Sequence, residues 1–202
     1  MIIPIAAQII YDQLDSSFIG AAIITIIFGF LFFLSNLTQD KKLNLQQAFL
    51  LTTLSWLSIA LFGCLPFLFS NLNLSFIDSF FESMSGITTT GSTVILDLDT
   101  SPKSILLWRA IMQWLGGIGI IVMATTVLPL LKVGGMQLFH LESDDPYEKT
   151  LPRIGKSGLE IASIYLTLTL ACSAMYYFSG MGGFDAIAHS MTTISTGGFS
   201  TY

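Results

Sequence analysis

Two short segments carry residue types that can hold a cation without water. Residues 88–93 read TTTGST and residues 195–200 read STGGFS. Hydroxyls and glycines let a backbone stand extended and turn its carbonyl oxygens inward, and a ring of such oxygens can replace the hydration shell of a cation. We therefore treat both segments as candidate ion-selective, pore-lining strands. Their residues are Thr88, Thr89, Thr90, Gly91, Ser92 and Thr93, and then Ser195, Thr196, Gly197, Gly198, Phe199 and Ser200.

Both segments belong to a longer unit that occurs twice. With a shift of 107 residues, 78–93 and 185–200 share six identities in sixteen positions. Average residue usage would give about one identity by chance. Three further pairs exchange one hydroxyl residue for another. A duplicated loop in an apolar chain is typical of transporters and channels.

The composition indicates that the elements around these segments lie in a bilayer. The chain has 52% hydrophobic and only 10% charged residues, and its mean hydropathy is +0.73. A soluble domain of this size could not bury so much apolar surface. The sequence predicts an all-α membrane protein. Runs long enough to cross the hydrocarbon core occur at 16–37, 46–70, 104–131 and 157–180.

The segments 74–87 and 183–194 precede the two candidate strands and are too short to span a membrane. We expect each to be a half-helix that enters the membrane and stops midway. A lipid-exposed loop at that depth would leave backbone groups unpaired, so the following strands must line water or ions. The C-terminal end of each half-helix would add a partial negative charge, which favours cations.

The basic residues predict the orientation, because Lys and Arg are retained on the cytoplasmic side. Lys41 and Lys42 follow the first span, and four more basic residues lie within 132–156. Both duplicated loops therefore open outward. The scattered basic residues form no patch for nucleic acid.

Two ionisable residues lie at predicted membrane depth, where an unpaired charge is costly. Glu82 is in the first half-helix and Arg109 is in the span that follows the first loop. We predict a structural ion pair between them, and the alternative is a direct role in ion binding. His189 replaces Glu82 in the second copy and is interpreted as a packing residue.

Other patterns favour structural roles. Gly116, Gly117 and Gly119 indicate close helix contact rather than a dinucleotide loop. Cys64 and Cys172 lie in apolar spans and are expected to act as small hydrophobes. An intramembrane hydrolase is the enzyme alternative, but no GxSxG motif is present. We expect no catalytic and no cofactor-binding residues.

Four stretches resemble the TrkH/KtrB superfamily of bacterial potassium uptake proteins, most closely its TrkH branch. They are residues 79–93, 108–139, 151–160 and 188–201. The resemblance implies four helix–pore loop–helix repeats around one pore, similar to potassium channels. It also implies that Gly91 and Gly198 are the key filter glycines.

By the same resemblance, potassium is the bound and transported ion, and its ligands are carbonyls of Thr89, Thr90, Thr196 and Gly197. The family implies a bacterial inner-membrane location with loops open to the periplasm. It further implies a homodimer with a cytoplasmic nucleotide-binding regulatory subunit of the TrkA type. The alternatives are a sodium-coupled transporter of the Ktr-like branch and a non-conducting membrane fragment.

The resemblance places this chain in the first half of such a protein, with two of the four filter strands. The expected divisions are introductory helices at 1–45 with the first one truncated, a first repeat at 46–131, a cytoplasmic link at 132–156, and the outer helix and pore loop of a second repeat at 157–202.

Overall fold

The structure is a computed structural model that describes residues 1–12, 15–35, 45–127 and 150–202. In these ranges the chain forms α-helices, one short 3-10 helix (Leu98–Thr100) and loops, with no β-strand, as expected for an all-α protein. The α-helices are α1 (Ile2–Ile10), α2 (Ser17–Ser35), α3 (Leu45–Gly63), α4 (Leu65–Phe69), α5 (Phe76–Ile87), α6 (Lys103–Val127), α7 (Thr150–Phe178) and α8 (Gly183–Ile194).

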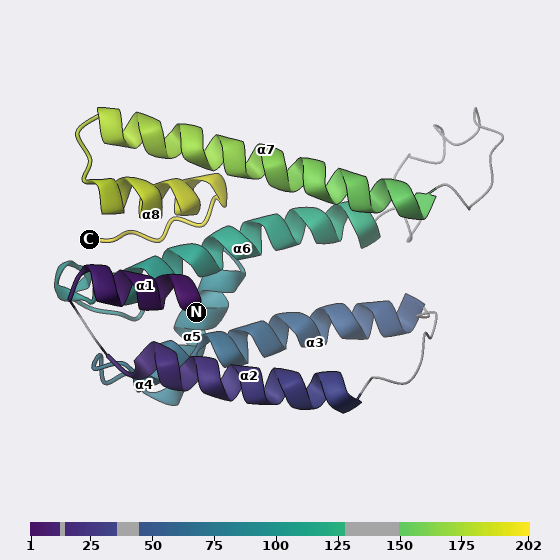
Figure 1. Cartoon of the computed structure of the whole chain (residues 1–202), viewed down its shortest axis with the longest axis horizontal. Helices are drawn as coiled ribbons and strands as arrows, with labels where there is room; N and C mark the ends of the chain where they lie inside the picture. The colour runs from purple at the N-terminus through teal and green to yellow at the C-terminus, as the bar shows by residue number, and fades with distance from the viewer. Residues whose placement is uncertain (13–14, 36–44, 128–149) are drawn as a thin grey trace.

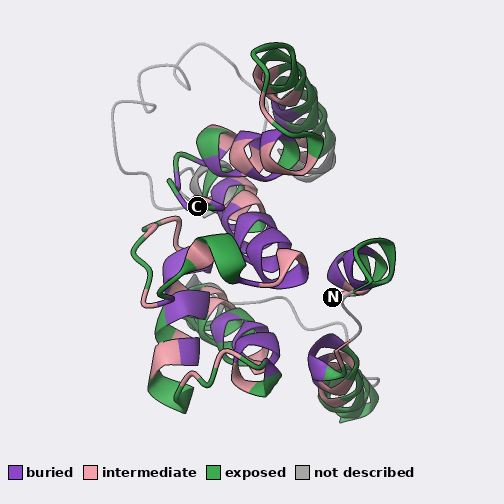
Figure 2. Cartoon of the chain, turned by 90° about the vertical axis from the view of Figure 1, so that its left-hand side faces the viewer, coloured by how far each residue is buried: buried purple, intermediate pink, exposed green. Residues whose placement is uncertain are grey.

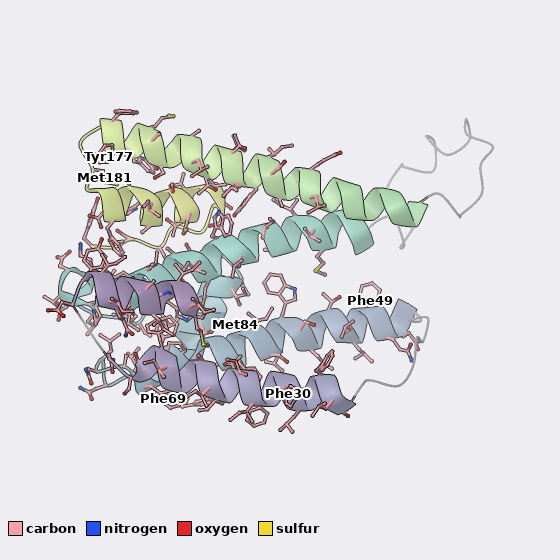
Figure 3. The ribbon with its side chains drawn as sticks, in the orientation of Figure 1. Phe30, Phe49, Phe69, Met84, Tyr177 and Met181 are labelled. Carbon is pink, nitrogen blue, oxygen red and sulfur yellow. The ribbon has the colours of Figure 1, made fainter. Side chains whose placement is uncertain are left out.

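Among the described residues, four stretches of helix are long and apolar enough to cross a membrane, and they match the four predicted spans. They are Ser17–Ser35, Phe49–Phe69, Lys103–Met123 and Gly158–Phe178. Large apolar side chains of these spans are exposed, among them Phe30, Phe49 and Tyr177, which Figure 3 labels. Lipid is the solvent that suits such a surface.

Helix α6 is the central element of the fold. Half of its spanning window is buried, against 22% or less for the other three spans. Helices α5 and α8 contact it, and Figure 1 shows α6 between α8 on one side and α5 on the other. Figure 2 shows buried residues gathered where these inner elements meet and exposed residues on the outer helices. Helix α6 is therefore placed to contact both copies of the repeat.

The second predicted span, 46–70, is divided at Cys64 into α3 and α4. Pro66 lies in the first turn of α4, and its ring removes one backbone donor from the helical ladder. Helical hydrogen bonds still cross the junction, since Cys64 N donates to Ala60 O (3.0 Å) and Leu68 N donates to Cys64 O (3.0 Å). The span is interrupted but continuous in direction.

The two half-helices have equal lengths. Helices α5 and α8 each contain 12 residues, and both of their ends differ by the 107-residue shift of the sequence repeat. Twelve residues rise about 18 Å, well short of the roughly 30 Å hydrocarbon core. At the start of α5, Ser75 and Asp78 form a capping box, in which each side chain accepts from the other residue's backbone N–H. The helix therefore begins two residues after the predicted position.

The boundary before α7 also differs from the expectation. Most of the predicted link at 132–156 lies outside the described residues, but residues 150–156 already belong to α7. Polar residues with helical backbone extend this helix beyond its apolar stretch, so hydropathy alone placed its start too late.

Candidate functional site

The two loops leave their half-helices in the same way. Each begins with a two-residue turn, at 88–89 and at 195–196, before the chain departs from helical structure. The expectation of extended strands from the first residue was therefore wrong for these turn residues. Equivalent backbone hydrogen bonds end both helices. After α5, the N–H groups of three successive residues donate to carbonyls of the helix: Thr88 N to Met84 O (2.9 Å), Thr89 N to Gly86 O (3.0 Å) and Thr90 N to Ser85 O (3.0 Å). After α8, the equivalent bonds are Ser195 N to Met191 O (3.2 Å), Thr196 N to Thr193 O (2.9 Å) and Gly197 N to Thr192 O (2.9 Å).

The loops also share an unusual backbone conformation at every second residue. The φ angles are 57° at Thr89 and 81° at Gly91, and 56° at Thr196 and 80° at Gly198. A positive φ is an outlier for a β-branched residue such as threonine and costs on the order of 1–3 kcal/mol. In an ordinary strand successive residues face opposite sides, so reversing φ at alternate residues can turn neighbouring carbonyls toward one side. Such strain at equivalent positions of two repeats points to a functional geometry.

Gly91 and Gly198 differ in how much space surrounds them. A Cβ on Gly91 would collide with the carbonyl oxygen of Gly197 in the other loop. A Cβ on Gly198 would meet no heavy atom within 4 Å. Gly91 is therefore required by both its φ and the approach of the second loop, whereas Gly198 is required by its φ alone. The two loops face each other at this point.

The structure brings Glu82 and Arg109 together. Arg109 Nε donates to Glu82 Oε1 at 2.7 Å, and the two side chains are 1% and 0% exposed. The carboxylate also accepts from Thr93 Oγ1 at 2.9 and 3.1 Å and from Val94 N at 3.0 Å. Glu82 therefore anchors the exit of the first loop to α5 and to α6.

Arg109 continues from this ion pair to the second loop. Its Nη1 donates to Ser200 O at 2.8 Å, and its guanidinium carbon lies 4.1 Å from the ring centroid of Phe199. Buried cations gain from such contacts with an aromatic face. One buried side chain on α6 thus contacts both repeats.

His189 takes the place of Glu82 in the second copy and contacts the corresponding part of its own loop. Its Nε2 lies 3.1 Å from Thr201 Oγ1, and its ring packs against Tyr202 with centroids 5.3 Å apart. Thr201 Oγ1 also donates to Asp185 Oδ1 at 2.7 Å. The exits of both loops are therefore tied back to their half-helices, through Glu82 in the first copy and through His189 and Asp185 in the second.

Adjacent glycines on α6 receive the inner ends of the two half-helices. A Cβ on Gly116 would collide with the backbone of Ile87, the last residue of α5. A Cβ on Gly117 would lie 2.8 Å from Ser195 Cβ, at the end of α8. The expected close helix contact is confirmed, and it places both C-terminal helix ends against one turn of α6.

Gln113 is the residue of the site that sequence reasoning missed. It lies on α6 one turn beyond Arg109, and its Oε1 accepts from Phe199 N at 3.1 Å. A glutamine in an apolar span is a weak signal by itself. Its spacing of four residues from a buried arginine places both on one face of the helix, and this was the available clue.

The chemistry of the site is that of backbone and hydroxyl oxygens. Within the residues that the structure describes, no group of three His, Cys, Asp or Glu side chains is arranged to hold a metal ion. Cys64 and Cys172 are both free thiols, and Cys64 is buried.

Comparisons with known proteins agree with this architecture. The family model described as TrkH, a cation transport protein, matches residues 15–202. The Trk system potassium uptake protein TrkH of Escherichia coli strain K12 is 42% identical over 206 residues, which cover 100% of this chain and 43% of that protein. The Trk system potassium uptake protein TrkI of Halomonas elongata is 43% identical over 201 residues, covering 99% of this chain and 41% of that protein.

The fold is likewise similar to a solved structure. The crystal structure of the potassium transporter TrkH from Vibrio parahaemolyticus superposes with a TM-score of 0.86 and 38% identity, covering 100% of this chain and 40% of that chain. The chain spans about two fifths of the length of these relatives. Because the family model matches nearly all of its residues, the chain belongs to the TrkH family of cation transport proteins.

Proposed function

We propose that this chain forms part of a potassium uptake pathway, with residues 88–93 and 195–200 as two strands of its selectivity filter. The carbonyl oxygens of Thr89, Thr90, Thr196 and Gly197 are the proposed ion ligands. The observation that carries the proposal is the matched alternation of positive φ angles at equivalent positions of both loops. The relatives named as potassium uptake proteins supply the identity of the ion.

The half-helices support this assignment by their electrostatics. Helices α5 and α8 end at Ile87 and Ile194, directly before the loops. The C-terminal end of a helix carries a partial negative charge equivalent to roughly half an elementary charge. Two such ends at the same turn of α6 would stabilise a cation held by the adjacent carbonyls. Two strands supply about half of the ring of oxygens that an ion needs, so the complete filter requires further strands.

The setting of the pathway follows from the distribution of charge. Basic residues on one side of the membrane favour a cytoplasmic location for that side, so the loops open outward. With the bacterial inner-membrane location that the family resemblance implies, the proposed opening is to the periplasm. We include in the proposal the homodimer and the TrkA-type cytoplasmic regulatory subunit that the family resemblance implies. Sodium coupling of the Ktr-like kind is the competing mechanism within transport.

A chimera tests the proposal. Residues 1–202 would replace the matching 206 residues of Escherichia coli TrkH, in cells without other potassium uptake systems, and rubidium and sodium uptake would be measured. Gly91→Ser and Gly198→Ser should lower rubidium uptake or its preference over sodium, because each puts a side chain on a positive-φ filter residue.

Gly29→Ser is the matched control, since Gly29 lies in α2 with no heavy atom within 4 Å of an added Cβ. It should transport as the parent chimera does. Unchanged uptake and selectivity in both filter variants would refute the filter assignment. Rubidium uptake that requires external sodium would favour the sodium-coupled alternative.

A further inference from the structure

We infer that Gln113 is a positioning residue that sets the spacing between the two filter loops and thereby the ion selectivity. The inference rests on the proposed function, because it assumes that the loops form a filter. It goes further by assigning a role to a residue on α6 that belongs to neither loop.

The side-chain amide of Gln113 lies beside the point where the two loops approach each other. The residue is 0% exposed. A Cβ added to Gly197 would collide with the amide group, and a Cβ added to Gly91 would lie 3.6 Å from its Nε2. The amide therefore contacts the second loop directly and faces the first loop at the residue where the loops approach each other.

The orientation of this amide is determined by one hydrogen bond. Its Oε1 accepts from Phe199 N at 3.1 Å. Its Nε2 is buried and has no hydrogen-bond partner among the described residues. Because Nε2 makes no hydrogen bond, the amide of Gln113 is held in place by the bond to Oε1 and by packing. The two ends of the amide therefore differ: Oε1 is bonded to the second loop and Nε2 is unpaired.

The second loop depends on α6 more than the first loop does. In the first copy, Ser85 Oγ donates to Ser92 O at 2.6 Å, so the half-helix holds its own loop. In the second copy the equivalent residue, Thr192, donates instead to His189 O at 3.2 Å. The matching part of the second loop is held by Gln113 and Arg109.

Because the second loop is held by side chains of α6, the position of that loop relative to the first depends on this helix. The side chain of Arg109 holds the carbonyl of Ser200, and that of Gln113 holds the N–H of Phe199. Arg109 also binds Glu82 of the first copy. Selectivity in a carbonyl filter depends on the size of the ring or on the number and field of its oxygens. Either quantity changes if the second loop moves relative to the first.

Two substitutions at Gln113 separate the hydrogen bond from the volume. Gln113→Met keeps a similar length and flexibility, but its thioether sulfur is only a weak acceptor for Phe199 N–H. Gln113→Glu keeps an acceptor at the same place. Gln8→Met is the matched control, because Gln8 is also a buried glutamine with an unpaired Nε2, and it lies in α1 away from the loops.

The measurement is rubidium and sodium uptake by the chimera with Escherichia coli TrkH, together with the amount of protein in the membrane. For Gln113→Met we expect the preference for rubidium over sodium to fall by about tenfold, which corresponds to about 1.4 kcal/mol and is the size of one lost hydrogen bond. Gln113→Glu should retain more of the preference than Gln113→Met. Gln8→Met should leave it unchanged.

The outcomes distinguish this inference from the proposed function. If Gly91→Ser alters selectivity while Gln113→Met does not, the filter stands and the positioning role is wrong. If neither alters it, the filter assignment itself fails. Loss of both Gln113 variants from the membrane, with Gln8→Met present, would assign the residue to folding and would overturn the inference.

Discussion

Replacement of Glu82 by glutamine tests the buried ion pair most directly. The change keeps the shape of the side chain but removes its charge, while Arg109 stays buried at 1% exposure. The substitution also weakens the acceptor for Thr93 Oγ1 and Val94 N. Breaking a buried pair by removing one partner costs about 3–5 kcal/mol, because it leaves an uncompensated buried charge. We expect a loss of stability in this range.

A double-mutant cycle measures how much of that loss comes from the pair. Arg109→Met removes the stranded charge, so Glu82→Gln with Arg109→Met should be less destabilised than the sum of the two single variants. For groups in direct contact the interaction energy is about 0.5–3 kcal/mol. Arg109→Met also loses its bond to Ser200 O, so we expect it to perturb the second loop in addition.

The assay is equilibrium unfolding of the chimera in mixed micelles, with increasing SDS and intrinsic tryptophan fluorescence as the signal. Glu160→Gln is the control, because Glu160 is an exposed residue of α7 where the same exchange strands no buried charge. Its unfolding should match that of the parent. A loss below about 1 kcal/mol for Glu82→Gln, the size of a surface pair, would refute the reasoning. Strict additivity in the cycle would do so as well.

Two further predictions concern close packing and the chain by itself. Gly116→Ala should destabilise the chimera by about 1–3 kcal/mol in the same unfolding assay, because the new methyl collides with the end of α5. Gly29→Ala, in open space within α2, should be neutral or stabilising by up to about 1 kcal/mol, and equal effects of the two would contradict the packing argument. Purified residues 1–202 in liposomes should not conduct potassium, because two strands supply about half a ring of ligands. Potassium-selective flux above that of empty vesicles would show that this argument is wrong.

The sequence by itself determined the elements with strong local signals. Hydropathy identified all four spans, because about 20 apolar residues are stable as helix in lipid. The repeat of 78–93 at 185–200 located both half-helices, and their C-terminal ends match the prediction. The charges of Glu82 and Arg109 were enough to predict their contact, since an isolated charge at that depth is unfavourable.

The sequence failed to predict two features: the polar first turns of α7 and the backbone conformation of the two loops. The start of α7 at Thr150 lay outside the apolar run. The positive φ angles of Thr89 and Thr196 could not be read from residue type, because threonine normally avoids that region. They exist because the bonds that end α5 and α8, and the contacts between the loops, hold the chain there.

Only the tertiary structure decided which face of α6 meets the loops and how the loops meet each other. The bond from Phe199 N to Gln113 joins residues 86 positions apart, and the bond from Arg109 to Ser200 O joins residues 91 positions apart. The rotation of α6 that makes both bonds depends on the packing of Gly116 and Gly117 against two separate half-helices. The sequence of one helix indicates which of its side chains share a face. What that face contacts is determined by the packing of elements that are distant in the chain.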